Sequence, residues 1–369
     1  MGKILFVASV DEHINCFHLP YLKWFKEHGY DVHVATNGTE KFADADKKFT
    51  VPFERSPLKI NNFTAYKVLK KIIDQNNYSL IHCHTPVASV ITRLAARKAR
   101  KSGTKVLYTA HGFHFCQGAP LKNWLIFYPI EKWCSRFCDC LITINREDFL
   151  FAQKKFSKTN VEYIHGIGID IDKFLNAKIN FKRKEERKKL GIADDDIMLL
   201  SVGELNKNKN HQLIIRCLAE LNNKKIHYII CGTGSLKKYL KGLIKELKLE
   251  NNVHLVGYQN QTVNFYHMAD IFVFPSRREG LPVSVMEAMS CNIPVVASNI
   301  RGCQDLILND ENGFLINVDD CQSWIQAIEK LAIDSNLKSK LIENNLKRIS
   351  KFSLTKSLQE MQKIYEDFL

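Results

Sequence analysis

The chain has 369 residues and a formal net charge of +14, and 45% of its residues are hydrophobic. This length exceeds one ordinary core and suits two α/β domains, while no apolar run reaches the about 18 residues of a membrane-spanning helix. The 11 cysteines follow no disulfide-framework spacing, so we expect a globular protein with reduced thiols in a cytosol.

The first half alternates short apolar strands with amphipathic stretches. Lys3–Ser9 is predicted as a strand rather than a signal peptide, because its apolar core is short and acidic residues follow at once. A helix is predicted over His18–His28. Further strands are predicted over Asp31–Thr36, Leu80–His84, Val106–Ala110 and Leu141–Ile144. Short apolar strands separated by helices favour a parallel sheet that is covered on both faces.

Basic residues concentrate in this first half, which carries more than half of the net positive charge. Arg93, Arg97, Arg100 and Lys101 recur at short steps that place them on one face of a helix. Three partners suit such a face: nucleic acid, an anionic membrane surface or phosphorylated substrates. A merely solvated helix face is the alternative.

A polar, strongly charged segment around Phe174–Leu190 interrupts the alternation, and we expect it to link two domains. The second half then repeats the pattern, with Leu236–Leu247 as an amphipathic helix. Its strands are predicted over Met198–Val202, His227–Cys231, Val253–Val256, Ile271–Pro275 and Pro294–Ala297. The last helical stretch is Leu354–Leu369, which can pack back on either half.

The predicted fold class is therefore α/β, with two doubly wound Rossmann-like domains facing across a cleft. We place an N-terminal domain over residues 1–178 and a second domain over residues 190–350. A C-terminal helix over residues 351–369 is expected to pack back on the N-terminal domain.

The most specific segment follows the Ile271–Pro275 strand and carries Glu279 and Glu287. Pro282 stands where the first helical turn prefers proline, so the next helix exposes its amide N–H groups toward the loop as a phosphate site. Gly280 lets the backbone approach a ligand closely. The two glutamates can reach different parts of one extended ligand, and their chance placement on a helix is the alternative.

Glu279 and Glu287, separated by seven residues in a Pro-Ser-x-x-Glu-Gly context, resemble the signature of family 4 retaining glycosyltransferases of the GT-B fold. The chain is similar to bacterial enzymes that make capsule and exopolysaccharide. The family's usual glycine before the Ile-Pro-Val-Val run is Asn292 here. The resemblance extends through Val202–His211, Ile230–Gly234 and Thr109–Phe113.

This resemblance implies a role for each matching residue of the second half. Glu287 holds the donor ribose, Glu279 lies beside the transferring sugar, and the amides of Gly280 and Leu281 hold phosphate. Lys209 matches the lysine that contacts the donor diphosphate, where it stabilises the leaving charge without a metal.

The remaining donor residues include one departure from the family. Gly203 and Asn206 lie in the same loop as Lys209, but Glu204 stands where the family has an arginine. Lys207 and Arg278 are candidate compensating cations. We expect the base near Gly257 and Tyr258, at the end of the Val253–Val256 strand.

In the first half, the resemblance places His111 near the donor sugar, and His84 has a similar position at a strand end. Strand-end histidines with a structural role are the alternative. The family's first loop carries paired glycines, whereas this chain has Ser9-Val-Asp-Glu-His13. Glu12 or His13 is therefore expected to take a polar role on the acceptor side.

No metal or other cofactor is expected, because no Asp-x-Asp pair stands in a plausible donor loop. Gly232-x-Gly234 lacks the third glycine of a dinucleotide fingerprint. Another group that could suggest zinc lacks the spacing of a structural site, and we expect its cysteines in the core. This group consists of His111, His114, Cys116, Cys134, Cys138 and Cys140.

The sequence thus predicts retaining transfer from a nucleotide-diphosphate sugar, with UDP as the expected nucleotide, to a glycan or polyprenyl-diphosphate-linked acceptor. The enzyme is expected in the cytoplasm, peripheral on the inner face of the plasma membrane, with no nucleic-acid partner. Its predicted membrane-docking residues are Arg93, Arg97, Arg100 and Lys101. The alternatives are a UDP-sugar epimerase and a non-catalytic membrane-binding protein of the same fold.

Overall fold

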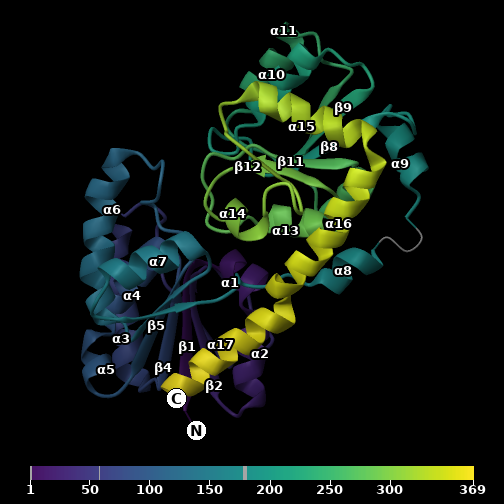
Figure 1. Cartoon of the computed structure of the whole chain (residues 1–369). Coiled ribbons are helices and arrows are strands. Elements are labelled where there is room, and N and C mark those ends of the chain that lie inside the picture. Colours follow the sequence, from purple (N-terminus) through teal and green to yellow (C-terminus); the bar gives the residue numbers. More distant parts are fainter. Residues whose placement is uncertain (1, 58, 178–180) are drawn as a thin grey trace. The chain divides into compact units, whose positions relative to one another are not determined.

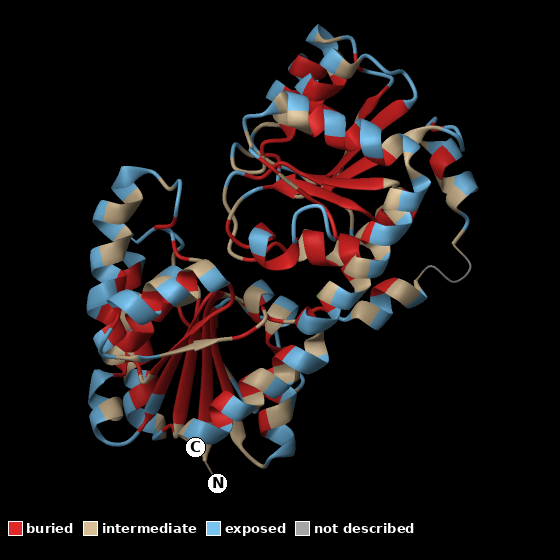
Figure 2. Ribbon diagram, in the orientation of Figure 1, coloured by how far each residue is buried: buried red, intermediate tan, exposed pale blue. Residues whose placement is uncertain are grey.

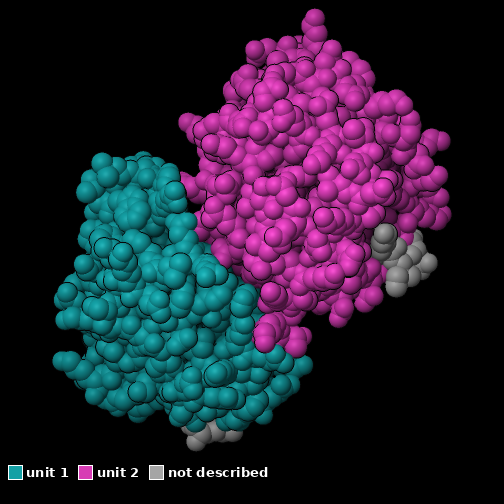
Figure 3. All heavy atoms as spheres, in the orientation of Figure 1, with its two compact units in different colours: residues 1–167, 357–369 teal, residues 168–356 magenta. Residues whose placement is uncertain are grey.

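The computed structural model describes residues 2–57, 59–177 and 181–369. The chain divides into two compact units (Figure 3). Unit 1 comprises Met1–Ile167 with Ser357–Leu369, and unit 2 comprises Gly168–Lys356. Each unit is a parallel sheet with helices on both faces (Figure 1).

Unit 1 contains a seven-stranded sheet in the order β3-β2-β1-β4-β5-β6-β7. The strands are β1 (Lys3–Val10), β2 (Asp31–Asn37), β3 (Lys47–Thr50), β4 (Leu80–His84), β5 (Lys105–Ala110), β6 (Cys140–Thr143) and β7 (Asn160–Tyr163). The helices are α1 (Asp11–Phe17), α2 (Leu19–Glu27), α3 (Asn61–Asn76), α4 (Pro86–Ala95), α5 (Arg97–Lys101), α6 (Leu121–Cys134), α7 (Arg146–Lys155) and most of α17 (Leu354–Phe368). The central strands are buried, as their continuous apolar runs predict (Figure 2).

Unit 2 contains a six-stranded sheet in the order β10-β9-β8-β11-β12-β13. The strands are β8 (Ile197–Val202), β9 (Ile226–Cys231), β10 (Val253–Gly257), β11 (Ile271–Phe274), β12 (Val295–Ser298) and β13 (Phe314–Ile316). The helices are α8 (Ile171–Asn176), α9 (Arg183–Lys189), α10 (His211–Leu221), α11 (Lys237–Glu246), α12 (Thr262–Met268), α13 (Val283–Ser290), α14 (Cys303–Leu306), α15 (Cys321–Ile333) and α16 (Ser335–Ile349). One face carries α10, α11 and α15, and the other carries α12, α13 and α16 (Figure 1).

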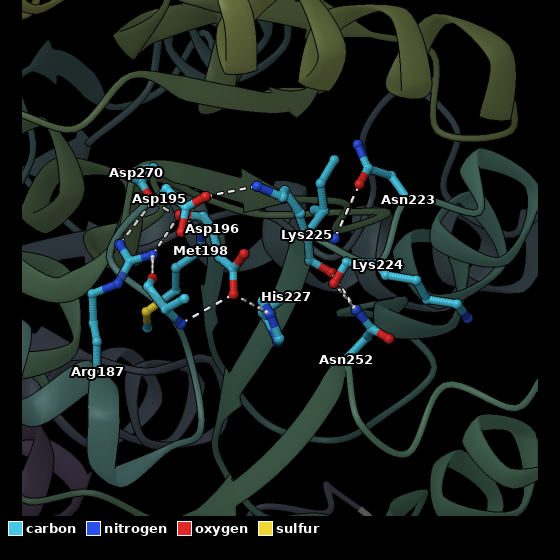
Figure 4. Close-up of polar contacts among 12 residues, drawn as sticks. Arg187, Asp195, Asp196, Met198, Asn223, Lys224, Lys225, His227, Asn252 and Asp270 are labelled. Atoms are coloured by element: carbon cyan, nitrogen blue, oxygen red, sulfur yellow. Dashed lines mark hydrogen bonds and ion pairs between the residues drawn. The ribbon is translucent and has the colours of Figure 1, made fainter.

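The charged segment expected to be a linker is instead part of unit 2. It forms α9, where Arg187 is fully buried and donates to Asp270 Oδ2 at 2.9 Å and to the Met268 carbonyl at 3.2 Å (Figure 4). Asp270 also accepts from the Met198 amide at 2.8 Å. These contacts fasten α9 to the amino ends of β8 and β11.

The boundary between the units accordingly differs from the one expected between residues 178 and 190. Unit 2 begins at Gly168, because the Ile169 amide bonds to the Phe352 carbonyl at 3.0 Å and α8 packs on α13. Residue 178, the expected end of the first domain, lies outside the described residues.

Helix α17 contributes its residues from Ser357 onward to unit 1. Tyr365 is fully buried, and its hydroxyl lies 2.8 Å from His82 Nδ1. His165 Nδ1 lies 2.8 Å from Glu360 Oε1 on the same helix. The end of the chain is therefore part of the core of unit 1, opposite α3 and α4 across the sheet (Figure 1).

Two cysteines of unit 2 lie side by side. Cys217 of α10 and Cys321 of α15 have Cα atoms 5.7 Å apart, a separation that a disulfide can bridge, so the expectation of reduced thiols stays a prediction. The cysteines weighed as zinc ligands are buried in unit 1, as expected for core residues: Cys116, Cys134, Cys138 and Cys140.

Candidate functional site

The carboxyl edge of the unit 2 sheet brings two predicted site residues together. Strands β8 and β11 are neighbours at the point where the strand order reverses, which is where doubly wound sheets bind ligands. Lys209 follows β8 and Glu279 follows β11, and Lys209 Nζ lies 2.7 Å from Glu279 Oε1. Both side chains are largely buried, so the surrounding protein holds this ion pair in place at the sheet edge.

Three polar residues that the sequence did not single out hold Glu279 in place. The Ser276 hydroxyl donates to Glu279 Oε1, and Asn208 Nδ2 lies 3.4 Å from the same oxygen. Arg301 is buried and donates from Nε to the Glu279 carbonyl at 2.8 Å. The carboxylate and its peptide unit therefore have a fixed orientation.

Glycines allow the loops at this edge to approach one another. A Cβ atom on Gly232 would lie 1.9 Å from the Gly203 carbonyl oxygen, and one on Gly302 would lie 2.3 Å from the Gly280 carbonyl oxygen. A Cβ atom on Gly203 itself would lie 3.3 Å from the Lys209 side chain. Close backbone contact therefore requires glycine at 232 and 302, and the lysine stem covers Gly203.

Glu287 lies on α13, where its Oε2 accepts a hydrogen bond from the Tyr266 hydroxyl at 2.6 Å. Burial raises the pKa of Glu287, against the opposing effects of the Tyr266 hydrogen bond and of Lys173. Tyr266 is itself fully buried, and burial raises its pKa well above 10. The two residues are thus a fixed pair, and Glu287 lies on the helix that follows the loop of Glu279.

Helix α13 begins at Val283, so Pro282 is its N-cap residue rather than part of the first turn. No side chain caps this end within the described part of the chain, which leaves the first amides directed at the Gly280–Leu281 loop. Asn292 adopts the left-handed conformation, with φ 61°, just after the helix ends, as the sequence predicts.

The other predicted donor residues occupy the rim of this edge. Asn206 Oδ1 accepts from the Lys209 amide at 2.9 Å, and Glu204 is exposed. Gly257 ends β10 with φ 78°, and Tyr258 beyond it is 75% exposed. Among the candidate compensating cations, Lys207 is exposed and Arg278 half-buried.

Unit 1 presents histidines at the corresponding edge. His13 Nε2 lies 3.2 Å from His111 Nε2, which in turn lies 3.5 Å from His84 Nδ1. His18, which the sequence did not single out, stacks on His84 with ring centroids 3.7 Å apart. Burial lowers the pKa of His13 to about 4 and holds the pKa of His18, His84 and His111 well below 6.5. Glu12 is exposed on α1.

A cavity of about 510 Å³ opens beside these histidines, within unit 1. His13 borders it, and most of its wall is apolar. The apolar lining includes Val10, Val87, Ile91, Phe113, Phe127 and Ile130. Arg55 and Glu131 are the charged residues in the lining.

The basic face predicted for membrane docking is not a single exposed face. The helical run breaks at Ala96, and Arg93 is 1% exposed with Nη2 2.9 Å from Glu131 Oε2. Arg100 pairs with Asp139 at 2.9 Å. Arg97 and Lys101 are exposed. The prediction that Arg93 contacts a membrane is wrong, because Arg93 is buried and pairs with Glu131, a residue distant in sequence.

Comparison with known families decides the identity of this arrangement. Residues 182–348 match the family model described as glycosyl transferases group 1, and residues 3–145 match the one described as glycosyl transferase 4-like. The glycosyltransferase EpsD of Bacillus subtilis strain 168 is 42% identical over 100% of this chain and 97% of its own. The chain belongs to the family 4 glycosyltransferases.

Other proteins similar to this glycosyltransferase agree with that assignment. An Escherichia coli UDP-Gal:alpha-D-GlcNAc-diphosphoundecaprenol alpha-1,3-galactosyltransferase is 27% identical, over 90% of this chain and 86% of its own. Anabaena HepE, crystallised with UDP and glucose, superimposes with a TM-score of 0.80 at 20% identity, over 100% of both chains. That likeness establishes the fold of this glycosyltransferase as GT-B.

Proposed function

We propose that this glycosyltransferase transfers a sugar, with retention of configuration, from a UDP-sugar to a lipid-linked glycan in surface polysaccharide synthesis. The observation that carries the proposal is the Lys209–Glu279 pair at the switch point of unit 2, beside the uncapped start of α13. The E. coli relative uses UDP-Gal and an undecaprenol-diphosphate-linked acceptor by name, and HepE binds UDP.

In the proposed reaction, the donor diphosphate lies against Lys209 and the amides of Gly280 and Leu281. The bond between the sugar C1 and the β-phosphate oxygen breaks, and the charge that develops on UDP meets the ammonium and the helix dipole. The acceptor hydroxyl attacks the same face of C1, and its proton passes to the departing phosphate oxygen. Glu279 orients the sugar, and Glu287 binds the ribose hydroxyls.

Lys209 and the amides of the α13 loop supply the positive charge that a divalent ion provides in other transferases. UDP binding by unit 2 should therefore survive chelation. Calorimetric titration of the full chain with UDP, with and without EDTA, should give equal affinities. Affinity that is lost in EDTA and restored by magnesium or manganese would contradict this assignment.

The acceptor is proposed to be lipid-linked because the cavity of unit 1 suits an isoprenoid chain better than a sugar. A sugar needs many hydrogen-bonding groups, whereas this cavity presents mainly aliphatic and aromatic side chains. Arg55 at its border is a cation that a polyprenyl diphosphate could pair with.

Helix α6 is the proposed membrane contact, in place of the basic face. Its exposed side includes Lys122 and Lys132 together with five large apolar residues. These are Leu121, Leu125, Ile126, Ile130 and Trp133. No described helix is long and apolar enough to cross a membrane. An apolar face with lysines suits shallow insertion at an anionic lipid surface, where a cytoplasmic enzyme would meet its acceptor.

Cosedimentation with vesicles tests this contact. Leu125→Gln combined with Ile126→Gln should release the protein from vesicles rich in phosphatidylglycerol, while Arg97→Gln combined with Lys101→Gln should have the smaller effect. Equal binding by wild type and the α6 variant would overturn the assignment.

The reaction itself is tested with a panel of UDP-sugars and a polyprenyl-diphosphate-linked sugar. We expect a disaccharide-lipid product whose new linkage has the anomeric configuration of the donor, read by NMR. Conversion of the UDP-sugar without any acceptor would instead identify an epimerase, and an inverted linkage would contradict retention.

A further inference from the structure

Four histidines of unit 1 gather at the carboxyl ends of β1, β4 and β5, which lie side by side in the sheet (Figure 1). His13 is on α1, His18 joins α1 to α2, His84 ends β4 and His111 follows β5. One ring nitrogen of each lies within 4.8 Å of those of the other three. This edge is the switch point of the unit 1 sheet, the position at which such sheets bind ligands.

The cluster leaves buried nitrogens without partners. His18 is 2% exposed and His84 is fully buried. Both ring nitrogens of His18 and Nε2 of His84 lack hydrogen-bond partners among the described residues. Neighbouring His82 provides a contrast, since its nitrogens contact Tyr365 and Thr109 at 2.8 Å each. Buried polar atoms are normally satisfied, so these nitrogens indicate a ligand.

We propose that His13, His18, His84 and His111 bind one divalent transition-metal ion of the zinc class. Ligand nitrogens of a tetrahedral zinc site lie about 3.3 Å apart, as follows from Zn–N bonds of about 2.0 Å. His111 Nε2 lies 3.2 Å from His13 Nε2 and 3.5 Å from His84 Nδ1, close to this edge. The unpartnered nitrogen of His84 is Nε2, so the His84 ring can offer either nitrogen to the ion. Four imidazoles without a carboxylate suit zinc, copper or nickel rather than magnesium or calcium.

A buried water molecule is the competing occupant. Water holds tetrahedral partners at about 2.8 Å, which spaces them about 4.6 Å apart, wider than both of these separations. The metal requires the stacked rings of His18 and His84 to turn so that one nitrogen of each faces it.

The backbone beside the cluster is strained, as is common at ligand sites. Thr85, a β-branched residue, has φ 62° directly after His84. Its Oγ1 accepts from the Ser9 amide at 3.0 Å, which ties the end of β4 to the end of β1. The backbone conformation of Thr85 thereby fixes the position of His84 at the end of β4.

The site is in unit 1 and includes His111, the histidine that the family resemblance places near the donor sugar. The sequence predicts no metal at any site, so this proposal departs from that expectation. A metal here would lie beside the cavity that His13 borders, so it would also order the wall of the proposed acceptor pocket.

The test is metal binding by the full chain after removal of metals with a chelator. Titration with zinc chloride should reveal one tight site per chain and raise the melting temperature. Cobalt(II) should give the visible absorption of a tetrahedral nitrogen site. His18→Gln and His84→Gln should each weaken zinc binding by at least roughly 100-fold.

His33→Gln is the matched control, because His33 is buried in the same unit but contacts Tyr78 and Asp31. It should leave zinc binding unchanged. His13→Gln removes a half-buried ligand and serves if a core variant does not fold, with the circular dichroism spectrum and the cooperative thermal unfolding of the full chain as the check of folding. No stoichiometric zinc binding by wild type, or equal affinity in wild type and His13→Gln, would overturn the proposal in favour of bound water.

Discussion

The two units have the same order of strands in their sheets, but they differ in the charge of the side chains at the carboxyl edge. In unit 2, the carboxyl edge of the sheet holds the Lys209–Glu279 ion pair, and the amino edge is braced by Arg187 and Asp270. In unit 1, the carboxyl edge holds neutral histidines and an apolar cavity, and the buried arginine, Arg93, lies beside that cavity. The same topology thus supports a buried ion pair in one unit and a largely apolar cavity, with Arg55 and Glu131 in its lining, in the other.

The largest expected effect is a loss of stability when the buried ion pair between Arg187 and Asp270 in unit 2 is removed. Arg187→Met should lower the free energy of unfolding by about 3 to 5 kcal/mol, because it leaves Asp270 and nearby carbonyls without their buried donor. UDP affinity measured well below the melting temperature should not change, since the brace lies at the opposite edge of the sheet. Chemical denaturation and calorimetric titration check the two parts.

Arg183→Met is the control, because Arg183 is a partly exposed partner of the same Asp270. It should cost no more than about 1 kcal/mol. Equal losses of unfolding free energy from Arg183→Met and Arg187→Met would remove the distinction between a buried and a surface pair.

Arg93→Met in unit 1 should affect both stability and acceptor use, since Arg93 pairs with Glu131 in the cavity wall.

Next in size is the loss of charge at the donor site. Lys209→Met should reduce kcat by about 10²- to 10³-fold, because a preorganised charge near the leaving diphosphate is lost. Lys207→Met removes an exposed lysine of the same loop and should have little effect. Initial rates at saturating donor and acceptor measure both, and a Lys209→Met enzyme with wild-type kcat would exclude the lysine from catalysis.

The two glutamates should separate binding from turnover. Glu287→Gln should weaken UDP binding about tenfold, equivalent to about 1.4 kcal/mol, because a neutral amide replaces the carboxylate proposed to bind the ribose. Glu279→Gln should mainly lower kcat, since the proposed position of Glu279 is beside the reacting sugar. Calorimetry and steady-state kinetics distinguish the two changes, and wild-type behaviour of both variants would refute the site assignment.

The smallest expected effect is a pH dependence in unit 2. Burial, with a smaller contribution from Lys209, lowers the pKa of His211 to about 4. As the pH falls, His211 is therefore protonated in the unfolded chain before it is protonated in the folded chain. The folded state is not destabilised by His211 above pH 6.5, and it loses stability as the pH falls from 6.5 toward 4. The loss is about 1.4 kcal/mol per pH unit. Melting temperatures at pH 7.5 and 5.5 should fall more for wild type than for His211→Gln, and equal shifts would contradict the assignment.

The sequence predicts the central strands to within a residue or two, since their apolar runs are continuous. It misses the edge strands β3, β7 and β13, which are short. Strand β3, Lys-Lys-Phe-Thr, has no buried residue and so lacks the apolar signal. Residues Lys47–Thr50 form a strand because they pair with β2, and their own four-residue sequence does not indicate this pairing.

The site shows the same limit. Lys209 and Glu279 can be placed together from the strand order and the family resemblance, because both follow neighbouring strands. Arg301 reaches the Glu279 carbonyl from a loop 22 residues away, and no local pattern indicates that contact. Periodicity likewise grouped Arg93 with exposed arginines, whereas its partner Glu131 lies 38 residues along the chain.

The contribution of α17 to unit 1 has a consequence for the order in which the two units can form during synthesis. Residues 1–167 are synthesised before unit 2, but unit 1 also needs Ser357–Leu369, which follow unit 2 in the chain. Tyr365, which packs against Phe25 and contacts His82, is added only after all of unit 2. Unit 2, continuous from Gly168 to Lys356, therefore has its whole sequence before unit 1 does.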